Sequence, residues 1–353
     1  MTTPDPGSVT PDRPHHVLLV GCGAMAREWL AITNQLNTVE LIGLVDINPT
    51  AAAELRQDLP DPLPTFTSLD EALTTTSPTI VFDITPPEAH EDITLTALEA
   101  GCHVLGEKPM STSVESAQRM VAAAREAGRV HAVTQTRRWN PAACAVTRAV
   151  DDTLIGNIEE IHADFFVGPH FGGFREEMAH PLLVDMAIHH FDLARMLGQC
   201  DPLRVLAHAH DPGRSWYDGK ASATAIFEMN DNITFTWRGS WCAEGCPTSW
   251  NAHWRLIGDR GTITWDGEEG ITIERVENTN DREFIRSTER IAPPPITLPH
   301  REHHGAIRDF LDALATSRNP WCPGHDNIKS LAMVLGAVES SGSGQWIDLD
   351  TTP

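Results

Sequence analysis

The sequence has few basic residues and no long apolar runs. Lysine and arginine together number 26 against 49 aspartates and glutamates, which gives a formal net charge of −23 over 353 residues. Such a charge repels phosphate backbones and no basic stripe interrupts it, so we expect no nucleic-acid partner. No apolar run reaches the ~18 residues of a membrane span, so we expect no membrane partner either. The acidity fits a salty cytoplasm or an ordinary solvated surface equally well.

Cysteine occurs seven times, an odd number scattered along the chain, which predicts free thiols in a reducing compartment. Cys242 and Cys246 are the closest pair, but no second Cys or His pair at a zinc spacing accompanies them. We interpret both as structural thiols and predict no metal site. Residues 1–14 lack the basic and apolar regions of a signal peptide, so we expect a short disordered leader on a cytoplasmic protein.

The chain is long enough for two domains, and 41% of its residues are hydrophobic. Strand and helix patterns alternate up to about residue 135, which is typical of a doubly wound parallel sheet. Strand patterns separated by turns follow, and in NITFTWR the apolar Ile233, Phe235 and Trp237 alternate with polar residues. We expect an N-terminal Rossmann domain over 15–136 and, over 137–353, an α+β domain with an open, mainly antiparallel sheet for substrate binding and oligomerisation.

A glycine-rich turn follows the first apolar run of the N-terminal domain. The segment GCGAMA has the pattern G-x-G-x-x-A, in which Gly21 and Gly23 allow a sharp turn and close approach to a pyrophosphate. The following helix offers free N–H groups to the phosphates, with Ala24 and Met25 in the same turn. Asp46 ends the next apolar run about 20 residues later, where a carboxylate accepts hydrogen bonds from ribose hydroxyls. This predicts NAD rather than NADP.

Two further segments carry groups suited to alcohol oxidation. Lys108 follows a short strand, and a cation there can hydrogen-bond a hydroxyl and stabilise a developing oxyanion. Asp185 and His189 are four residues apart in a helical pattern, which places a base and a carboxylate on one face. His190 points about 100° away on such a helix, and we interpret it as structural. The alternative for Lys108 is an ordinary surface lysine. The alternative for the other pair is an aspartate at a helix N-terminus and a buried, hydrogen-bonded histidine.

At three places the chain resembles the Gfo/Idh/MocA oxidoreductase family: the GCGAMA turn with Asp46, Glu107-Lys108-Pro109, and the D-x-x-x-H pattern from Asp185 to His189. The resemblance implies that His189 is the general acid/base and that Asp185 assists it or binds substrate. It makes cofactor neighbours of Thr85, Pro86, His90, Glu107 and Lys108. It makes substrate contacts of Arg138, Trp139, Asn140, His180 and Asp185. The loop from Trp241 to Trp250 is a possible sugar-stacking surface.

The resemblance also implies the activity. We expect an NAD-dependent oxidoreductase that transfers hydride reversibly between NAD and a secondary hydroxyl of a sugar, cyclitol or polyol-like substrate. Two alternatives stay open: an enzyme with tightly bound NAD that uses transient oxidation for epimerisation, aldose exchange or glycosidic cleavage, and a non-catalytic cofactor-sensing regulator. The His300, His303 and His304 cluster is interpreted as the start of a helix, and the open sheet predicts a homodimer or homotetramer.

Overall fold

The computed structural model describes residues 14–59, 62–277 and 284–352, and these divide into two compact units. The sheet A unit comprises residues 14–136 and 299–331 together with residue 352. The sheet B unit comprises residues 137–298 and 332–351. The predicted disordered leader, residues 1–14, falls almost wholly outside the described residues.

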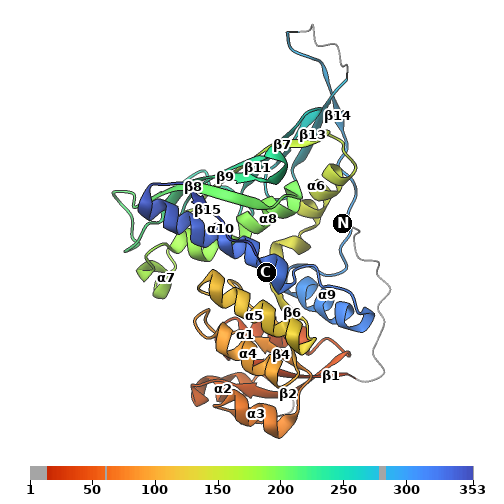
Figure 1. Cartoon of the computed structure of the whole chain (residues 1–353), viewed down its shortest axis with the longest axis vertical. Helices are drawn as coiled ribbons and strands as arrows, with labels where there is room; N and C mark the ends of the chain where they lie inside the picture. Colours follow the sequence, from red (N-terminus) through yellow and green to blue (C-terminus); the bar gives the residue numbers. More distant parts are fainter. Residues whose placement is uncertain (1–13, 60–61, 278–283, 353) are drawn as a thin grey trace. The chain divides into compact units, whose positions relative to one another are not determined.

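Sheet A contains six parallel strands in the order β3-β2-β1-β4-β5-β6 (Figure 1). Its strands are β1 (His15–Val20), β2 (Val39–Val45), β3 (Thr65–Phe66), β4 (Ile80–Asp83), β5 (His103–Gly106) and β6 (His131–Val133). The chain winds outward from β1 to β3 and then returns to place β4 on the other side of β1. This confirms the predicted doubly wound sheet, in which ligands bind at the carboxyl ends of the strands where the winding reverses.

The helices of the sheet A unit cover both faces of sheet A. They are α1 (Ala26–Thr33), α2 (Pro49–Arg56), α3 (Leu69–Thr76), α4 (His90–Glu99), α5 (Val114–Ala127), α9 (Glu302–Thr316) and the first turns of α10 (Gly324–Ser343). Alternate β1 residues face opposite sides, so Val17 packs in the cluster that contains Trp29, and Leu18 packs in the cluster that contains Leu98. Ser68 caps the start of α3, where its Oγ accepts from Glu71 N at 3.4 Å.

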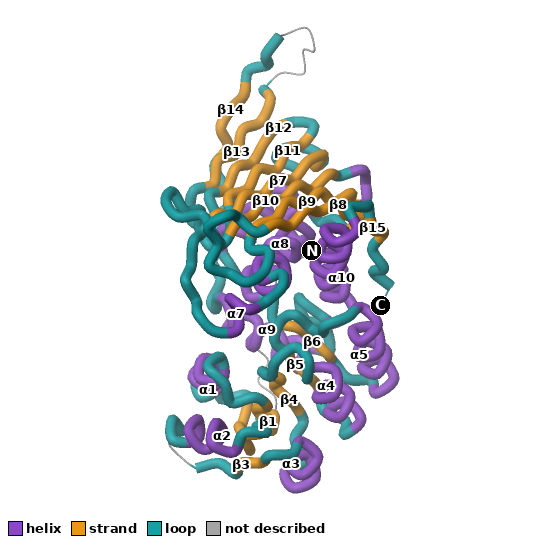
Figure 2. Tube along the Cα trace, turned by 90° about the vertical axis from the view of Figure 1, so that its left-hand side faces the viewer, coloured by secondary structure: helices purple, strands orange, loops and turns teal. Residues whose placement is uncertain are grey.

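Sheet B contains nine strands in the order β14-β13-β12-β11-β7-β10-β9-β8-β15 (Figure 2). Every pair is antiparallel except β10 with β7. Its strands are β7 (Ile158–Phe166), β8 (Pro202–His210), β9 (Ser222–Met229), β10 (Thr234–Ser240), β11 (His253–Gly258), β12 (Gly261–Trp265), β13 (Ile271–Val276), β14 (Thr288–Ile291) and β15 (Ile347–Asp348). The mainly antiparallel sheet is therefore confirmed.

Helices cover one face of sheet B. The unit contains α6 (Pro141–Asp151), α7 (Phe174–Glu177), α8 (Ile188–Gly198) and the rest of α10, with 3₁₀ turns at Thr136–Trp139 and Asn230–Asn232 and a π-helix at Leu182–Ala187. Phe191 of α8 packs edge-on against Phe235 and Trp237, which are fully buried as the alternation predicted. On β7, Phe165 is buried on the helix-covered side, whereas its neighbour Phe166 is half-buried on the opposite face, which carries mainly polar residues.

The domain division differs from the expected one in its C-terminal part. Residues 299–331 lie in the sheet A unit instead of continuing the domain that begins at residue 137. The backbone explains this, because Val133 N donates to the Cys322 carbonyl oxygen at 3.1 Å and Ala132 pairs with Pro323. All seven cysteines are free thiols. No helix within the described residues is long and apolar enough to span a membrane.

Candidate functional site

The turn after β1 is built around Gly21. Its φ is +92°, and a Cβ added there would lie 2.6 Å from the Ile84 carbonyl carbon and oxygen. Glycine is therefore required both by the backbone conformation and by the close approach of the next segment. Gly23, in contrast, has open space around it, and Ala24 and Met25 are exposed. One side of the turn is therefore exposed to solvent, and its other side is packed against the segment that follows β4.

The N-terminus of α1 has no side-chain cap, since its N-cap residue Met25 makes no capping hydrogen bond. Uncapped N–H groups with a positive dipole end are the usual phosphate-binding feature of this turn. Ala26, at the third position of the motif, is fully buried where helix and strand touch. The geometry fits the predicted pyrophosphate site.

Asp46 lies at the end of β2 and links two backbone segments. Its Oδ2 accepts from Cys22 N and its Oδ1 from Asn48 N, both at 2.7 Å. The carboxylate therefore holds the glycine turn in place.

The carboxyl ends of β4 and β6 leave polar atoms without partners in the described part of the chain. Asp83 is buried, with Oδ1 accepting from Thr85 Oγ1 at 2.6 Å and no partner for Oδ2. Burial raises the pKa of Asp83. Gln135 is 1% exposed, and neither its amide nitrogen nor its amide oxygen has a partner. Buried polar groups normally have partners, so these orphans at the ligand-binding edge fit a cofactor with polar groups of its own. Sequence reasoning missed both residues.

His90 links residues 83–90 to the segment that contains Lys108. His90 is buried, and its two ring nitrogens lie 2.8 Å from the Thr85 carbonyl oxygen and 2.9 Å from the Pro109 carbonyl oxygen. The expected cofactor contact through this ring does not fit, because both nitrogens already face backbone carbonyls. Thr85 is half-buried and Pro86 is exposed, so these two remain at the surface of the site.

Glu107 was expected to contact the cofactor, but its carboxylate is occupied inside the sheet A unit. Its Oε1 accepts from Trp29 Nε1 at 2.9 Å and lies 3.0 Å from His303 Nε2, while Oε2 accepts from Lys108 N at 3.2 Å. Glu107 is 9% exposed. Its role is therefore to anchor the segment, whereas Lys108, preceding a cis peptide bond to Pro109, is half-buried.

His303 completes this anchor and was missed at the level of sequence. Its Nδ1 lies 2.8 Å from Glu28 Oε1, so the ring bridges two carboxylates. Burial disfavours the charged ring, but the hydrogen bond to Glu107 and the charges of Glu107 and Glu28 outweigh burial and raise the pKa of His303. Burial likewise opposes ionisation of Glu107, and His303 reverses that effect, so the pKa of Glu107 is lowered. The pair is a buried ion pair behind the lysine.

In the sheet B unit, Asp185 and His189 do not lie on one regular α-helix as expected. Asp185 belongs to the π-helix Leu182–Ala187, and His189 is the second residue of α8. A π-helix inserts an extra residue per turn, which changes the angle between the two side chains. Both residues are half-buried. Asp185 Oδ2 accepts from Arg175 Nε of α7 at 2.7 Å, a partner that the sequence did not suggest.

His190 is structural, as predicted. It is fully buried, its Nδ1 accepts from Trp237 Nε1 at 3.3 Å, and its Nε2 lies 3.2 Å from the Trp250 carbonyl oxygen. Burial, followed by the charge of Arg137, lowers the pKa of His190 to about 3. The ring is therefore neutral at neutral pH.

Three expected substrate contacts have structural duties instead. Arg138 is 3% exposed and donates from Nε and one terminal nitrogen to the two Asp192 oxygens, each at 2.8 Å. Trp139 is buried. Asn140 caps α6, its Oδ1 accepting from Ala142 N and Ala143 N. Substrate binding by Arg138 does not fit, because its guanidinium is used in a buried ion pair.

His180 lies two residues before the π-helix. Its side chain is half-buried, and its Nδ1 is a buried atom that has no partner within the described residues. Burial, followed by the charge of Lys220, lowers the pKa of His180. A neutral imidazole with an unused nitrogen can donate to or accept from a ligand hydroxyl.

Exposed aromatic rings surround the Arg175–Asp185 pair. The Arg175 guanidinium lies 5.2 Å from the centre of the Phe171 ring and 4.8 Å from that of Phe174. Phe171, Phe174 and Trp250 are 41%, 63% and 44% exposed. Trp250 belongs to the loop expected to stack on a sugar, whereas Trp241 at the start of that loop is 1% exposed and packs in the core.

The doubly wound sheet, its glycine turn and the uncapped helix define a dinucleotide-binding domain, and comparison with known proteins gives the family. Residues 15–135 match the oxidoreductase family with an NAD-binding Rossmann fold, and residues 144–264 match the GFO/IDH/MocA C-terminal domain. The chain belongs to the Gfo/Idh/MocA oxidoreductase family.

Similar proteins align over most of the chain. The 1,5-anhydro-D-fructose reductase of Ensifer adhaerens is 25% identical and covers 94% of this chain and 98% of its own length. An inositol 2-dehydrogenase of an Arthrobacter species is 28% identical over 62% of this chain and 68% of its own. The structure of an oxidoreductase from Agrobacterium radiobacter, solved with NAD+, L-tartaric acid and magnesium, has 18% sequence identity and a TM-score of 0.81. The match covers 95% of this chain and 98% of that one. That structure supports the fold alone.

Proposed function

We propose that this protein is an NAD-dependent dehydrogenase or reductase acting on a secondary hydroxyl of a sugar, cyclitol or similar polyol. The observation that carries the proposal is the anchored Glu107-Lys108-Pro109 segment at the carboxyl end of β5. Glu107 is fixed by Trp29 and His303, so the backbone that carries the half-buried Lys108 is held in one position. Relatives named as sugar and inositol oxidoreductases support the substrate class.

We assign the residues the following roles. The Lys108 ammonium donates to the oxygen of the reacting hydroxyl and stabilises negative charge that develops there. His189 accepts the hydroxyl proton during oxidation and returns it during reduction. Asp185, oriented by Arg175, accepts hydrogen bonds from substrate hydroxyls or from His189. NAD, when bound, supplies the hydride acceptor.

The residues of the glycine turn favour NAD over NADP. We expect Asp46 to face the ribose 2′-hydroxyl, because a carboxylate at the end of the second strand has that role in such turns, and it would repel the 2′-phosphate of NADP. The next two residues, Ile47 and Asn48, offer no cation, and Ile47 is 92% exposed. We infer that NAD binds more tightly than NADP.

The sheet B unit supplies groups suited to a polyhydroxylated ring. Phe171, Phe174 and Trp250 offer apolar faces, while Asp185, Arg175 and His180 offer hydrogen-bonding atoms. Sites that combine a few oriented polar groups with aromatic surface are typical for small polar ligands.

The test follows reduced nicotinamide by absorbance while the purified protein is offered NAD or NADP with a panel of sugars and cyclitols. We expect turnover with NAD that falls at least ~10³-fold in Lys108→Ala and in His189→Ala, since each removes a group acting in the transition state. Lys329→Ala and His208→Ala are matched controls, and both should retain activity. Thermal unfolding and NAD binding establish that each variant is folded.

Other outcomes would redirect the assignment. Bound NAD that is released only by acid, with no net reduction by any panel member, favours an enzyme that uses transient oxidation. NAD binding without any turnover, unchanged in the Lys108→Ala variant, contradicts an enzymatic role. Failure to bind either nucleotide overturns the proposal.

A further inference from the structure

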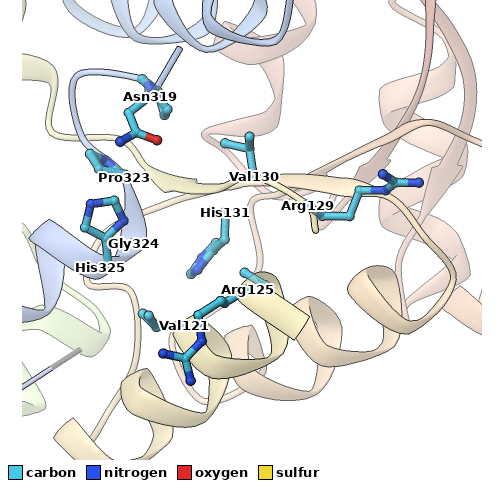
Figure 3. A pocket seen from close by; sticks show the side chains of 11 residues that line it. Val121, Arg125, Arg129, Val130, His131, Asn319, Pro323, Gly324 and His325 are labelled. Atoms are coloured by element: carbon cyan, nitrogen blue, oxygen red, sulfur yellow. The ribbon is translucent and has the colours of Figure 1, made fainter. Parts of the chain in front are cut away.

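A cavity of about 290 Å³ lies beside β6, the edge strand of sheet A (Figure 3). It is lined by the amino end of β6, the last turns of α5 and the start of α10. The strands are parallel, so Val130 and His131 at the start of β6 lie at the edge away from the carboxyl ends that carry Gly21 and Lys108. The cavity is therefore separate from the nucleotide site.

His131 is a buried polar side chain that points into this cavity. It is 5% exposed, and its Nδ1 has no hydrogen-bond partner within the described residues. A Cβ added to Gly324 would lie 2.6 Å from that nitrogen, so the ring lies directly against the first residue of α10. Figure 3 shows the ring between α5 and the start of α10. A buried imidazole nitrogen without a partner is costly unless a ligand or water supplies one.

The start of α10 also lines the cavity. The helix runs for 20 residues from Gly324, and the residue before it is Pro323, which has no side-chain oxygen. Asp326 lies in the first turn, where its Oδ1 is 3.7 Å from Lys329 Nζ, and it is not among the residues that line the cavity. A helix N-terminus favours negative charge.

The charged groups that line the cavity are all basic. Arg125 of α5 is exposed, and no ion pair or hydrogen bond engages its side chain in the described part of the chain. His325 and the Asn319 side chain lie across from it (Figure 3). Arg129 also lines the rim, but its Nε donates to the Gly101 carbonyl oxygen at 2.5 Å. No carboxylate lines the cavity, although the chain as a whole carries a net charge of −23.

We propose that this cavity binds a phosphate group. Residues that carry donors line it from separate elements: Arg125 from α5, His131 from β6, and Asn319, Gly324 and His325 at and before the start of α10. A tetrahedral phosphate can accept from several directions at once, whereas a planar carboxylate suits a single fork of donors. The volume is at the small end of ligand pockets, which fits free phosphate or the phosphate of a small metabolite. The inference does not depend on the proposed oxidoreductase activity.

The experiment is calorimetric titration of sodium phosphate into protein saturated with NAD, so that the glycine turn is occupied. Ionic strength is held constant with chloride. We expect saturable binding that Arg125→Gln weakens about tenfold or more, since a charge-assisted contact contributes on the order of 1.4 kcal/mol or more. Arg119→Gln is the matched control: it lies on the same helix, pairs with Glu91 and does not line the cavity.

A second measurement reports position. In protein labelled at histidine, phosphate should shift one ring resonance that is missing from His131→Asn, and the shift should saturate with the calorimetric affinity. Tighter binding of a sugar phosphate than of inorganic phosphate identifies a metabolite as the source, and equal binding identifies free phosphate. No saturable heat, or equal weakening by Arg119→Gln and Arg125→Gln, or an unmoved His131 resonance overturns the proposal.

Discussion

His303 gives the clearest test at the scale of a single residue. Protonated His303 pairs with Glu107, and its raised pKa means that folding favours the charged ring. The stabilisation is therefore complete below the unfolded pKa near 6.5 and is lost as pH rises through the higher folded value. Glu107, with its lowered pKa, contributes above about 4.5 and loses its contribution as pH falls. We predict that His303→Gln lowers the free energy of unfolding by about 1.5–3 kcal/mol near pH 6.

The difference between wild type and His303→Gln should shrink as pH rises above about 6.5 and through the raised folded pKa of His303. Urea unfolding at a series of pH values measures it. His300→Gln is the matched control, because burial lowers the pKa of His300 and its contribution should not fade at alkaline pH. A difference for His303→Gln that stays constant or grows as pH rises from 6 into the alkaline range contradicts a charged pair.

Motif residues could be predicted from the sequence more readily than their partners. The spacing indicated Gly21, Asp46 and Lys108 because each follows a strand end. The partners of Glu107 lie 78 residues before it and 196 after it, and no local pattern connects such distances. Arg138 was wrongly expected to contact a ligand, because it is a basic residue between the two domains. It instead forms an ion pair with Asp192, 54 residues later in the sequence.

At the scale of elements, strands and capped helices followed local rules. Alternation placed Phe235 and Trp237 in the core, and Ser68 caps the start of α3. The π-helix Leu182–Ala187 was missed because its apolar pattern also fits an α-helix, and packing of the surrounding unit decides where an extra residue is accommodated. The packing of α9 in the sheet A unit was not predicted, because the Pro-rich segment 291–299 before it shows no preference for either unit.

The β1–α1 turn supports a prediction about an element. Gly21→Ala forces a side chain into positive φ and against the Ile84 carbonyl, so we expect a loss of about 2 kcal/mol or more in the free energy of unfolding. Gly23→Ala meets nothing within 4 Å and should leave stability nearly unchanged. NAD titration then separates a role in folding from a role in binding. Gly23→Ala should weaken the affinity for NAD, because the pyrophosphate approaches that position in turns of this kind. If Gly21→Ala unfolds at the same denaturant midpoint as the wild type, the predicted strain at Gly21 is contradicted.

At the scale of the whole molecule, the uncovered face of sheet B favours association between copies of the chain, whereas the net charge opposes it. Helices pack on the face that carries Trp237, while Thr224, Ile226 and Arg238 on the other face are exposed. Several charges on that face are already paired within the chain, as in Arg238 with Asp164 at 2.6 Å. The face is therefore broad, largely neutralised and available for a second copy, whereas the charge of −23 on each chain opposes approach.

We predict that the protein forms homodimers or homotetramers through this face and that association strengthens with salt. Raising ionic strength from about 0.01 to 0.15 M shortens the screening length from ~30 to ~8 Å, which weakens repulsion between chains more than close contacts within the face. Sedimentation velocity across a wide concentration range measures the mass. Ile226→Arg, a charge placed on the face at a position 37% exposed, should shift the population toward monomer, whereas Ile47→Arg at a 92% exposed position in the sheet A unit should not. Wild-type protein that sediments as a monomer at every concentration and salt level contradicts the prediction, and equal effects of the two variants would place the interface elsewhere.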